Sequence, residues 1–464
     1  MKKQLLCGLI GLFSAHGALA MDLMETYEKA LSYDSGIAAA RASLRAQEAT
    51  ADISRSALLP QISAYGDANH IDSDGPNQDV SYQSYGYGVQ LTQPLFRAEA
   101  WFAYDAAQLQ TEAARAEYNL AQQQLILDVA TAYFDVLRAA DALTTARATE
   151  NAIQRQYDQA QERFDVGLIA ITEVYEARAS YDDATARRIA AENELDIARE
   201  RLARLTGEYT EELENLKQDF PLIQPVPANP NEWEQTATSQ NWQIQTAIKR
   251  LQASKANLDE ARAGHYPTLD LNASYGRQRI DGLDSRAPGG AIGTSQFDGT
   301  TTEGRIGLSL NVPLYAGGGI QAGVRQQRAS VDVQEQNLNT TRRDVRVNTR
   351  SLYRTVNTNI EAASALDQTI VSRRSALDAT LAGYDVGTRN IVEVLDAQRA
   401  YYVALRDYAN ARYDYVVNTL GLKQAAGTLS PQDLMELNRW LSESAPGIEA
   451  LANESDTIED PTTP

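Results

Sequence analysis

The sequence has long stretches without proline. Its 464 residues include 14 prolines, yet none occurs from residue 95 to 220 or from 314 to 430. Proline in a helix interior costs about 3 kcal/mol, so two proline-free spans of this length predict long helices. Glycine in the first span occurs only at Gly167 and Gly207, where it is expected to end helices. The expected helices cover residues 36–57, 98–164, 172–206, 234–263, 320–382 and 391–425.

Cysteine is almost absent. The single cysteine, Cys7, lies in a segment with two lysines at 2–3, an apolar run over 5–13 and the small-residue pattern A-L-A at 18–20. This is the pattern of a secretory signal, and we expect cleavage after Ala20 and export in a Gram-negative-type cell. The mature chain would then have no disulfide and no thiol chemistry.

Side chains that commonly carry catalysis are also scarce. Beyond the signal the only histidines are His70 and His265, and no glycine-rich loop is followed by the lysine of a phosphate-binding site. The glycines at 317–319 lack the strand and lysine of a P-loop, so we interpret them as a hinge at a strand-to-helix junction. We therefore expect no enzyme activity, no cofactor and no metal site.

Long apolar runs and positive charge are missing too. After the signal no run approaches the roughly 18 apolar residues that predict a membrane-spanning helix. The formal net charge is −20 at pH 7, which argues against nucleic acid as a partner because phosphate backbones attract basic surfaces. Neither absence excludes a membrane.

Alternation of apolar and polar side chains is present in four segments. It runs through 84–92, 268–276 and 305–314, and more weakly through the residues after Pro60. A tilted transmembrane strand needs about 9–11 residues, and apolar-out, polar-in alternation is typical of membrane barrels. The polar segments expected to form loops between these strands are 69–81 and 280–303.

Four strands are too few to close a barrel. About eight strands make the smallest membrane barrels. An open sheet edge in lipid would leave backbone groups unpaired, at a cost of several kcal/mol each. If these strands lie in a bilayer, several chains must contribute to one barrel.

The chain also contains two copies of one pattern. FDVGLIAITEVYEA at 164–177 corresponds to YDVGTRNIVEVLDA at 384–397, and QPLF at 93–96 corresponds to VPLY at 312–315. The order helix, strand, strand, long helix, turn, helix therefore occurs twice, as a tandem duplication would produce. Each copy of the turn is expected to close a helical hairpin at the end far from the strands.

Two acidic residues follow each turn. Glu393 and Asp396 are three residues apart on an expected helix and share a face, as do Glu173 and Glu176. Asn390 and Glu393 also fit a capping box, and acids near a helix N-terminus gain about 0.3–1 kcal/mol from the helix dipole. The residues alone leave this structural explanation and a functional one open.

Several long motifs carry a resemblance to a known family. They are TAYFDVLRAADAL at 131–143, RFDVGLIAITEVYEARASYDDA at 163–184, GHYPTLDL at 264–271, DVGTRNIVEVLDAQ at 385–398 and ANARYDYVVNTLGLKQAAGTLSPQDL at 409–434. With these motifs, the signal and the doubled halves, the chain resembles the TolC family of outer-membrane channel-tunnels. The resemblance extends to about residue 445.

The resemblance implies a mixed membrane α+β fold. It implies a homotrimer with one shared twelve-stranded β-barrel, four strands per chain, continuous with a long α-helical coiled-coil barrel. The implied segments are a signal peptide at 1–20, N-terminal helices at 21–57, barrel strands and extracellular loops at 58–96 and 265–316, helical hairpins at 97–207 and 317–426, an equatorial region at 208–264 and 427–445, and an acidic disordered tail at 446–464.

The same resemblance implies site residues around the two turns. Glu393 and Asp396 would line a periplasmic constriction, although family members usually have Asp at the position of Glu393. A trimer would place six carboxylates in one ring, which would favour cations. The residues implied in gate bonds of the closed state are Thr172, Glu173, Tyr384 and Arg389. The residues implied in docking periplasmic adaptor proteins are Val166, Gly167, Leu168, Val386, Gly387 and Thr388.

By resemblance, the chain is expected to be the outer-membrane exit duct of tripartite multidrug efflux pumps and type I protein secretion systems, extending into the periplasm. Its expected partners are two further copies of itself, a periplasmic adaptor (membrane fusion) protein, an inner-membrane transporter of RND, ABC or MFS type, and outer-membrane lipid. The alternative is a periplasmic or secreted coiled-coil adaptor or filament protein. The signal and the four lipid-length strands argue against that alternative.

Overall fold

The computed structural model describes residues 20–75, 78–286 and 299–443. The expected signal peptide and acidic tail lie outside the described residues. The chain divides into two compact units. The strand unit comprises residues 41–118 and 243–342, and the helical unit comprises the described parts of 1–40, 119–242 and 343–464. Each unit is described by itself.

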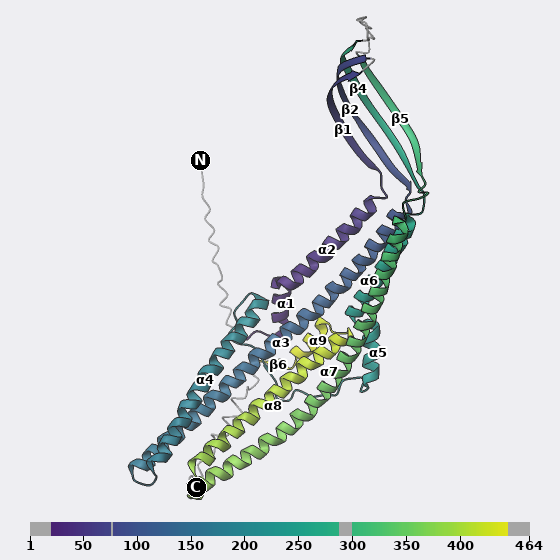
Figure 1. Ribbon diagram of the computed structural model, residues 1–464. Coiled ribbons are helices and arrows are strands. Elements are labelled where there is room, and N and C mark those ends of the chain that lie inside the picture. The colour runs from purple at the N-terminus through teal and green to yellow at the C-terminus, as the bar shows by residue number, and fades with distance from the viewer. Residues whose placement is uncertain (1–19, 76–77, 287–298, 444–464) are drawn as a thin grey trace, which may run out of the picture. The chain divides into compact units, whose positions relative to one another are not determined.

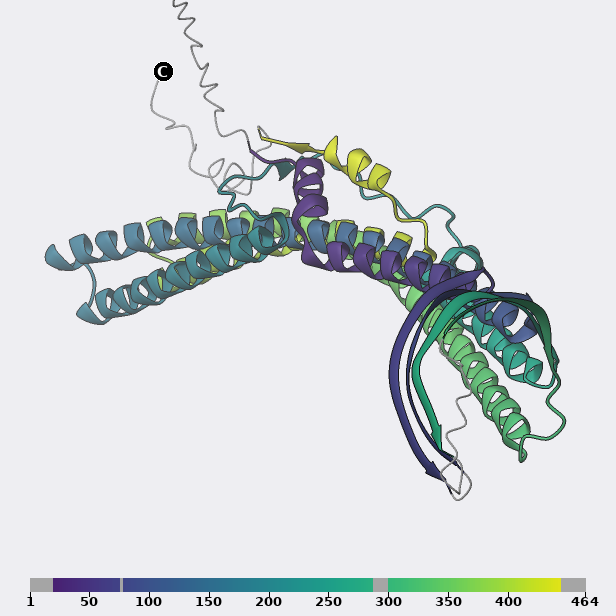
Figure 2. The same ribbon diagram turned by 90° about the horizontal axis from the view of Figure 1, so that it is seen from above.

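The strand unit contains one antiparallel sheet with the order β1-β2-β4-β5 (Figure 1). Its strands are β1 (Gln61–Gly75), β2 (Gln78–Phe96), β4 (Thr268–Arg286) and β5 (Gly299–Asn311). Figure 2 shows the four strands as one curved sheet. Within the described chain, β1 and β5 each pair on one side only, so the sheet has two open edges.

The strands are longer than expected. The prediction of loops at 69–81 and 280–303 was wrong for most of these residues, because β1, β2, β4 and β5 all continue into them. The backbone pairs in register there, for example Asn69 with Ser84 and Thr301 with Gln278. Strands pair through backbone groups and do not require apolar side chains. The polar sequence of these segments therefore led to a prediction of loops where the strands in fact continue.

The pairing register places the predicted apolar positions on one side of the sheet. Ile62 pairs with Leu91, Leu91 with Ala273, and Ala273 with Ile306. The next row joins Ala64, Val89, Tyr275 and Gly304. We call this side the apolar face and define it by the following residues: Ile62, Ala64, Val89, Leu91, Leu271, Ala273, Tyr275, Ile306 and Leu308. Five of these side chains are exposed in the single chain, namely Ile62, Val89, Tyr275, Ile306 and Leu308.

The opposite side of the sheet, the polar face, is hollowed. A pocket of about 280 Å³ is lined there by residues that include Tyr65, Asp67, Ser274, Gln278, Thr301, Glu303 and Arg305. Gly88 and Gly276 allow the ring of Tyr65 to cross this face, because an added Cβ would lie 2.8 and 2.7 Å from the Tyr65 hydroxyl. The alternation predicted from the sequence is thus confirmed, with polar side chains on the hollowed face.

The long helices agree with the predicted ranges. They are α2 (Ser35–Ser56), α3 (Ala98–Asp165), α4 (Ile171–Thr206), α7 (Gly319–Asp385) and α8 (Ile391–Ala426). The single helix expected over 234–263 is instead two, α5 (Pro230–Gln240) and α6 (Trp242–Ala263). Asn241 is extended between them, and its side chain donates to the Ala425 carbonyl over 2.9 Å. Short elements complete the helical unit: α1 (Leu23–Tyr33), α9 (Pro431–Asn438), β3 (Asn215–Leu216) and β6 (Leu441–Ser442).

Two polar contacts, one of them buried, join α3 to α8 in the helical unit. The Tyr413 hydroxyl donates to the Asp141 carboxylate over 2.6 Å, and Arg138 donates to Asp414 over 2.7 Å. Burial and the neighbouring Asp141 carboxylate raise the pKa of Tyr413 well above its ordinary value. These contacts fix the two helices side by side. Among the described helices, none has an apolar stretch long enough to cross a membrane.

Candidate functional site at the two hairpin turns

The two repeated turns have the same backbone closure. At the end of α3, Gly167 has φ 77°, its N–H donates to the Phe164 carbonyl, and the Leu168 N–H donates to the Arg163 carbonyl. At the end of α7, Gly387 has φ 75°, its N–H donates to Tyr384, and the Thr388 N–H donates to Gly383. This is the Schellman pattern, which favours glycine because other residues are strained at positive φ.

The residues that were predicted to dock adaptor proteins form the ends of these turns. Val166, Leu168 and Val386 are large apolar side chains, and each is more than two-thirds exposed. Both glycines are also open, since an added Cβ would meet nothing within 4 Å. The structure therefore presents an apolar tip at each hairpin, with nothing from the described chain covering it.

The second turn carries additional hydrogen bonds. The Gly383 carbonyl accepts from the N–H groups of Thr388 and Arg389, at 2.9 and 3.2 Å, and from the Thr388 hydroxyl at 2.9 Å. In the first turn the matching positions are Leu168 and Ile169, which have no side-chain donors. The second turn is thus closed by side chain as well as backbone.

The helices that follow the turns start differently. Asn390 caps α8, because its side-chain oxygen accepts from the Glu393 N–H at 3.0 Å. Ala170, at the matching position of α4, makes no side-chain cap. The predicted capping box is only half formed, because the Glu393 carboxylate turns to Arg389 instead and accepts from it at 2.5 Å.

Each of the two predicted constriction acids lies near an arginine of the same chain. Glu393 pairs with Arg389, and Asp396 is 3.8 Å from Arg399. Both acids are at the start of α8, and the Asp396 side chain is largely exposed. The single chain therefore supplies partial charge compensation to both carboxylates.

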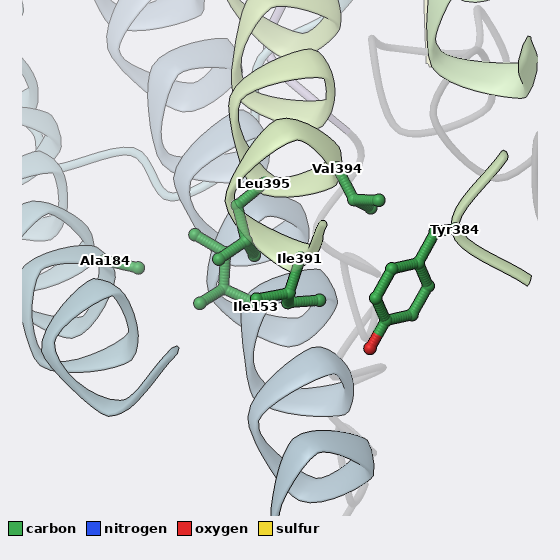
Figure 3. Packing of buried hydrophobic residues seen from close by; sticks show 6 residues of the cluster. All are labelled: Ile153, Ala184, Tyr384, Ile391, Val394 and Leu395. Carbon is green, nitrogen blue, oxygen red and sulfur yellow. The ribbon is translucent and has the colours of Figure 1, made fainter. Parts of the chain in front are cut away.

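Tyr384 is buried between the two hairpins. It belongs to an apolar cluster with Ile153, Ala184, Ile391, Val394 and Leu395 (Figure 3). The Arg163 guanidinium lies 4.9 Å from the centre of its ring, a distance at which cations are attracted to aromatic faces. The Tyr384 hydroxyl has no hydrogen-bond partner among the described residues.

The structure does not bring all four predicted gate residues together. Thr172 and Glu173 lie in the first turn of α4, and in the described part of the chain neither side chain bonds to Tyr384 or Arg389. Sequence reasoning also missed Arg163, which sits beside Tyr384. In the alignment of the two repeats, Arg163 corresponds to Gly383. This difference between an arginine and a glycine was the sequence signal that could have indicated a role for Arg163.

A metal site is not found here. Among the residues that the structure describes, no group of three or more His, Cys, Asp or Glu side chains could hold a metal ion.

Comparisons with known proteins identify the family. The family described as outer membrane efflux protein matches residues 26–208 and again 233–428, once in each half. The chain is 38% identical over 448 residues to the outer membrane protein TolC of Escherichia coli, which covers 95% of this chain and 90% of that protein. It is 35% identical to TolC of Vibrio cholerae, covering 91% and 94%. It is 26% identical to the alkaline protease secretion protein AprF of Pseudomonas aeruginosa, covering 92% and 89%.

Solved structures match the fold. The Campylobacter jejuni outer-membrane channel CmeC aligns with a TM-score of 0.74 at 18% identity, covering 91% of this chain and 90% of that one. The open state of the Neisseria gonorrhoeae outer-membrane channel MtrE aligns with a TM-score of 0.72 at 21% identity, covering 88% and 90%. The chain therefore belongs to the outer membrane efflux protein family and is an outer-membrane exit channel that extends into the periplasm.

Proposed function

We propose that three copies of this chain form one channel that is closed at its periplasmic end by the second hairpin. The observation that carries the trimer is the four-stranded sheet with two open edges and an exposed apolar face. Unpaired edges in lipid cost several kcal/mol per backbone group, so the edges of β1 and β5 must find partners. Three sheets joined edge to edge would make a closed barrel with the polar face inside.

The closed gate depends on Arg389 in this proposal. Its side chain is 58% exposed and binds Glu393, in the first turn of α8 of the same chain. In the trimer we expect Arg389 to exchange Glu393 for Glu173 of a neighbouring copy, and Tyr384 to supply its hydroxyl to Thr172 or Glu173. Charge-assisted bonds of this kind are strong enough to hold a hairpin and can be exchanged when a partner protein engages.

The constriction in this proposal is a ring of Glu393 and Asp396 from three copies. In the single chain Arg389 and Arg399 lie close enough to Glu393 and Asp396 to reduce the repulsion between these acids. When Arg389 moves to Glu173, Glu393 loses its counter-charge and the ring becomes more attractive to cations.

The partners follow from relatives with different roles. TolC, the secretion protein AprF and the Brucella suis efflux protein BepC all match most of this chain. We therefore propose that the duct serves efflux or secretion through a periplasmic adaptor and an inner-membrane transporter, with the exposed tips at Val166, Leu168 and Val386 as the adaptor contact.

Conductance of single channels in planar lipid bilayers tests the gate. The double variant Tyr384→Phe, Arg389→Ser should raise the resting conductance several-fold. Arg374→Ser, an exposed position on the same helix α7, is the matched control and should leave it unchanged. Unchanged conductance in the double variant would contradict the gate, whereas a wild-type chain that never forms trimers or conducts would contradict the channel assembly itself.

The constriction has its own test. Replacing both acids, Glu393→Gln and Asp396→Asn, should lower the preference for cations over anions and abolish block by multivalent cations, since the ring would lose its charge. The double variant Glu361→Gln, Asp367→Asn on α7 serves as a control of equal charge change away from the turn. An unaltered selectivity would place the constriction elsewhere.

A further inference from the structure

Two arginines stand on the apolar face of the sheet where its apolar rows end. Along β4 the side chains that point to this face are Leu269, Leu271, Ala273, Tyr275, Arg277 and Arg279. The register joins Arg277 to Tyr87 and Thr302, and joins Arg279 to Tyr85 and Thr300. Both arginines are exposed.

The spacing puts these arginines at the border of the lipid band. Leu269 to Tyr275 spans about 20 Å along the strand at roughly 3.4 Å per residue, close to the 25 Å or so of an outer-membrane barrel's apolar band. Tyr275, Tyr85 and Tyr87 are aromatic and exposed at this level. Aromatic side chains gather at the interface between lipid tails and headgroups. We therefore expect Arg277 and Arg279 to lie at the depth of the lipid headgroups.

The end of the sheet that carries the arginines is opposite the end where the strands join α2 and α3. The chain enters β1 from α2 and leaves β2 for α3 at the other end, where Gln61 pairs with Thr92. Since the helical part of this channel extends into the periplasm, the arginines lie on the side of the outer leaflet.

The two arginines differ in their partners. The Arg279 Nε donates to both carboxylate oxygens of Asp281, at 2.9 and 2.7 Å. Arg277 forms no ion pair with any residue that the structure describes. A guanidinium presents a planar fork of donors that matches a phosphate, and it binds best where water is partly excluded.

We propose that Arg277, assisted by Arg279, binds the phosphate groups of the phosphorylated glycolipid in the outer leaflet of the outer membrane. The proposal rests on the barrel assembly proposed above, in which the apolar face meets lipid. It adds a ring of three such sites around the barrel, one per copy. Charge complementarity and continuity with the lipid-facing rows favour lipid phosphate over any soluble anion.

Native mass spectrometry of the purified trimer tests this site with two probes, bisphosphorylated lipid A and the same lipid after removal of its phosphates. The wild-type trimer should retain the phosphorylated form at least tenfold better, because hydrogen bonds between a guanidinium and a phosphate are charge-assisted. Arg277→Gln should abolish most of that preference, and Arg277→Lys should keep part of it. Arg279→Gln should have a smaller effect, because Asp281 already occupies that guanidinium.

Arg305→Gln is the matched control. Arg305 lies in the same sheet but on the polar face, where it pairs with Glu303 at 2.7 Å. The site is refuted if the wild type holds both lipids equally, or if Arg305→Gln reduces lipid retention as much as Arg277→Gln does. Bilayer conductance of the same samples separates the two proposals, since a conducting trimer without phosphate preference would leave the channel intact and reject only the lipid site.

Discussion

The two hairpin turns of this chain share a backbone and differ in what holds them. Both end with a glycine at positive φ and the same pair of closing hydrogen bonds. Ile171, after the first turn, is 40% exposed, whereas Ile391, at the same place after the second, is 1% exposed. Duplication thus preserved the geometry of the turn, while the packing around it diverged.

The difference shows that the second turn is anchored and the first is not. Tyr384 and Ile391 pack against Ile153 and Ala184 of the first hairpin, and Arg163 covers the Tyr384 ring. A second hairpin that swings outward has to leave this cluster. The anchor for the proposed gate is therefore partly apolar and comes from the neighbouring hairpin of the same chain.

Among these substitutions, removing the buried side chain of Ile391 should reduce stability most. Ile391→Ala should destabilise the second hairpin by about 2–5 kcal/mol, because it leaves a cavity in a packed cluster. The matched substitution Ile171→Ala should cost well under half as much, since that side chain is already partly in water. Hydrogen exchange of the α7–α8 and α3–α4 ends, followed by mass spectrometry, measures both. Equal costs at the two positions would show that the turns are anchored alike.

Exchanging the helix caps should give the next largest effect. Asn390→Ala removes the bond to the Glu393 N–H and should cost about 1 kcal/mol. Ala170→Asn supplies a cap that the first turn lacks and should stabilise the start of α4 by a similar amount. We expect hydrogen exchange to become faster at the start of α8 in Asn390→Ala and slower at the start of α4 in Ala170→Asn. If Ala170→Asn had no effect, the backbone of the first turn would not be preorganised for a cap.

The fold was largely predictable because its signals are long. Proline-free spans and Gly167 located α3 and α4 to within a residue or two, and the two-residue alternation located all four strands of the sheet. The break at Asn241 was not predictable, since its cause is a contact with Ala425, far away in the sequence. Local sequence patterns are enough to locate helices and strands, whereas the interruption at Asn241 depends on a contact with a residue distant in the sequence.

The contacts made at the two turns were less predictable than the turns themselves. The short spacing of Arg389 and Glu393 permits a bond within one chain, yet the sequence equally permits Arg389 to bind an acid of another copy. The contact between Arg163 and Tyr384 joins two halves of the chain, and no period in the sequence encodes it. The ring and the cation meet where the end of α3 lies beside the end of α7.

Removing the side-chain closure of the second turn should have a modest effect. Thr388→Val deletes the hydroxyl that donates to the Gly383 carbonyl and should cost about 0.5–1 kcal/mol, because two N–H donors to that carbonyl remain. Leu168→Thr at the matching place of the first turn should gain less than this, since Arg163 replaces Gly383 there. Thermal unfolding of the trimer and local hydrogen exchange measure both. A loss above about 2 kcal/mol would mean that Thr388 has a further partner in the assembly.

The Arg389–Glu393 pair should contribute least to stability, and this is why it can act as an exchangeable contact. The two side chains are 58% and 38% exposed, and Arg389 lies just before the N-cap of α8, where the helix dipole disfavours a cation. Glu393→Gln should therefore cost no more than about 0.5 kcal/mol at low salt, and nothing near 1 M salt, where the screening length falls to about 3 Å. Glu176→Gln on α4 is the control, because Glu176 belongs to none of the proposed gate bonds. A larger loss at Glu393 that persists in high salt would mean that the pair is fixed in place, and the proposed exchange to Glu173 of a neighbouring copy would then be too costly to open and close a gate.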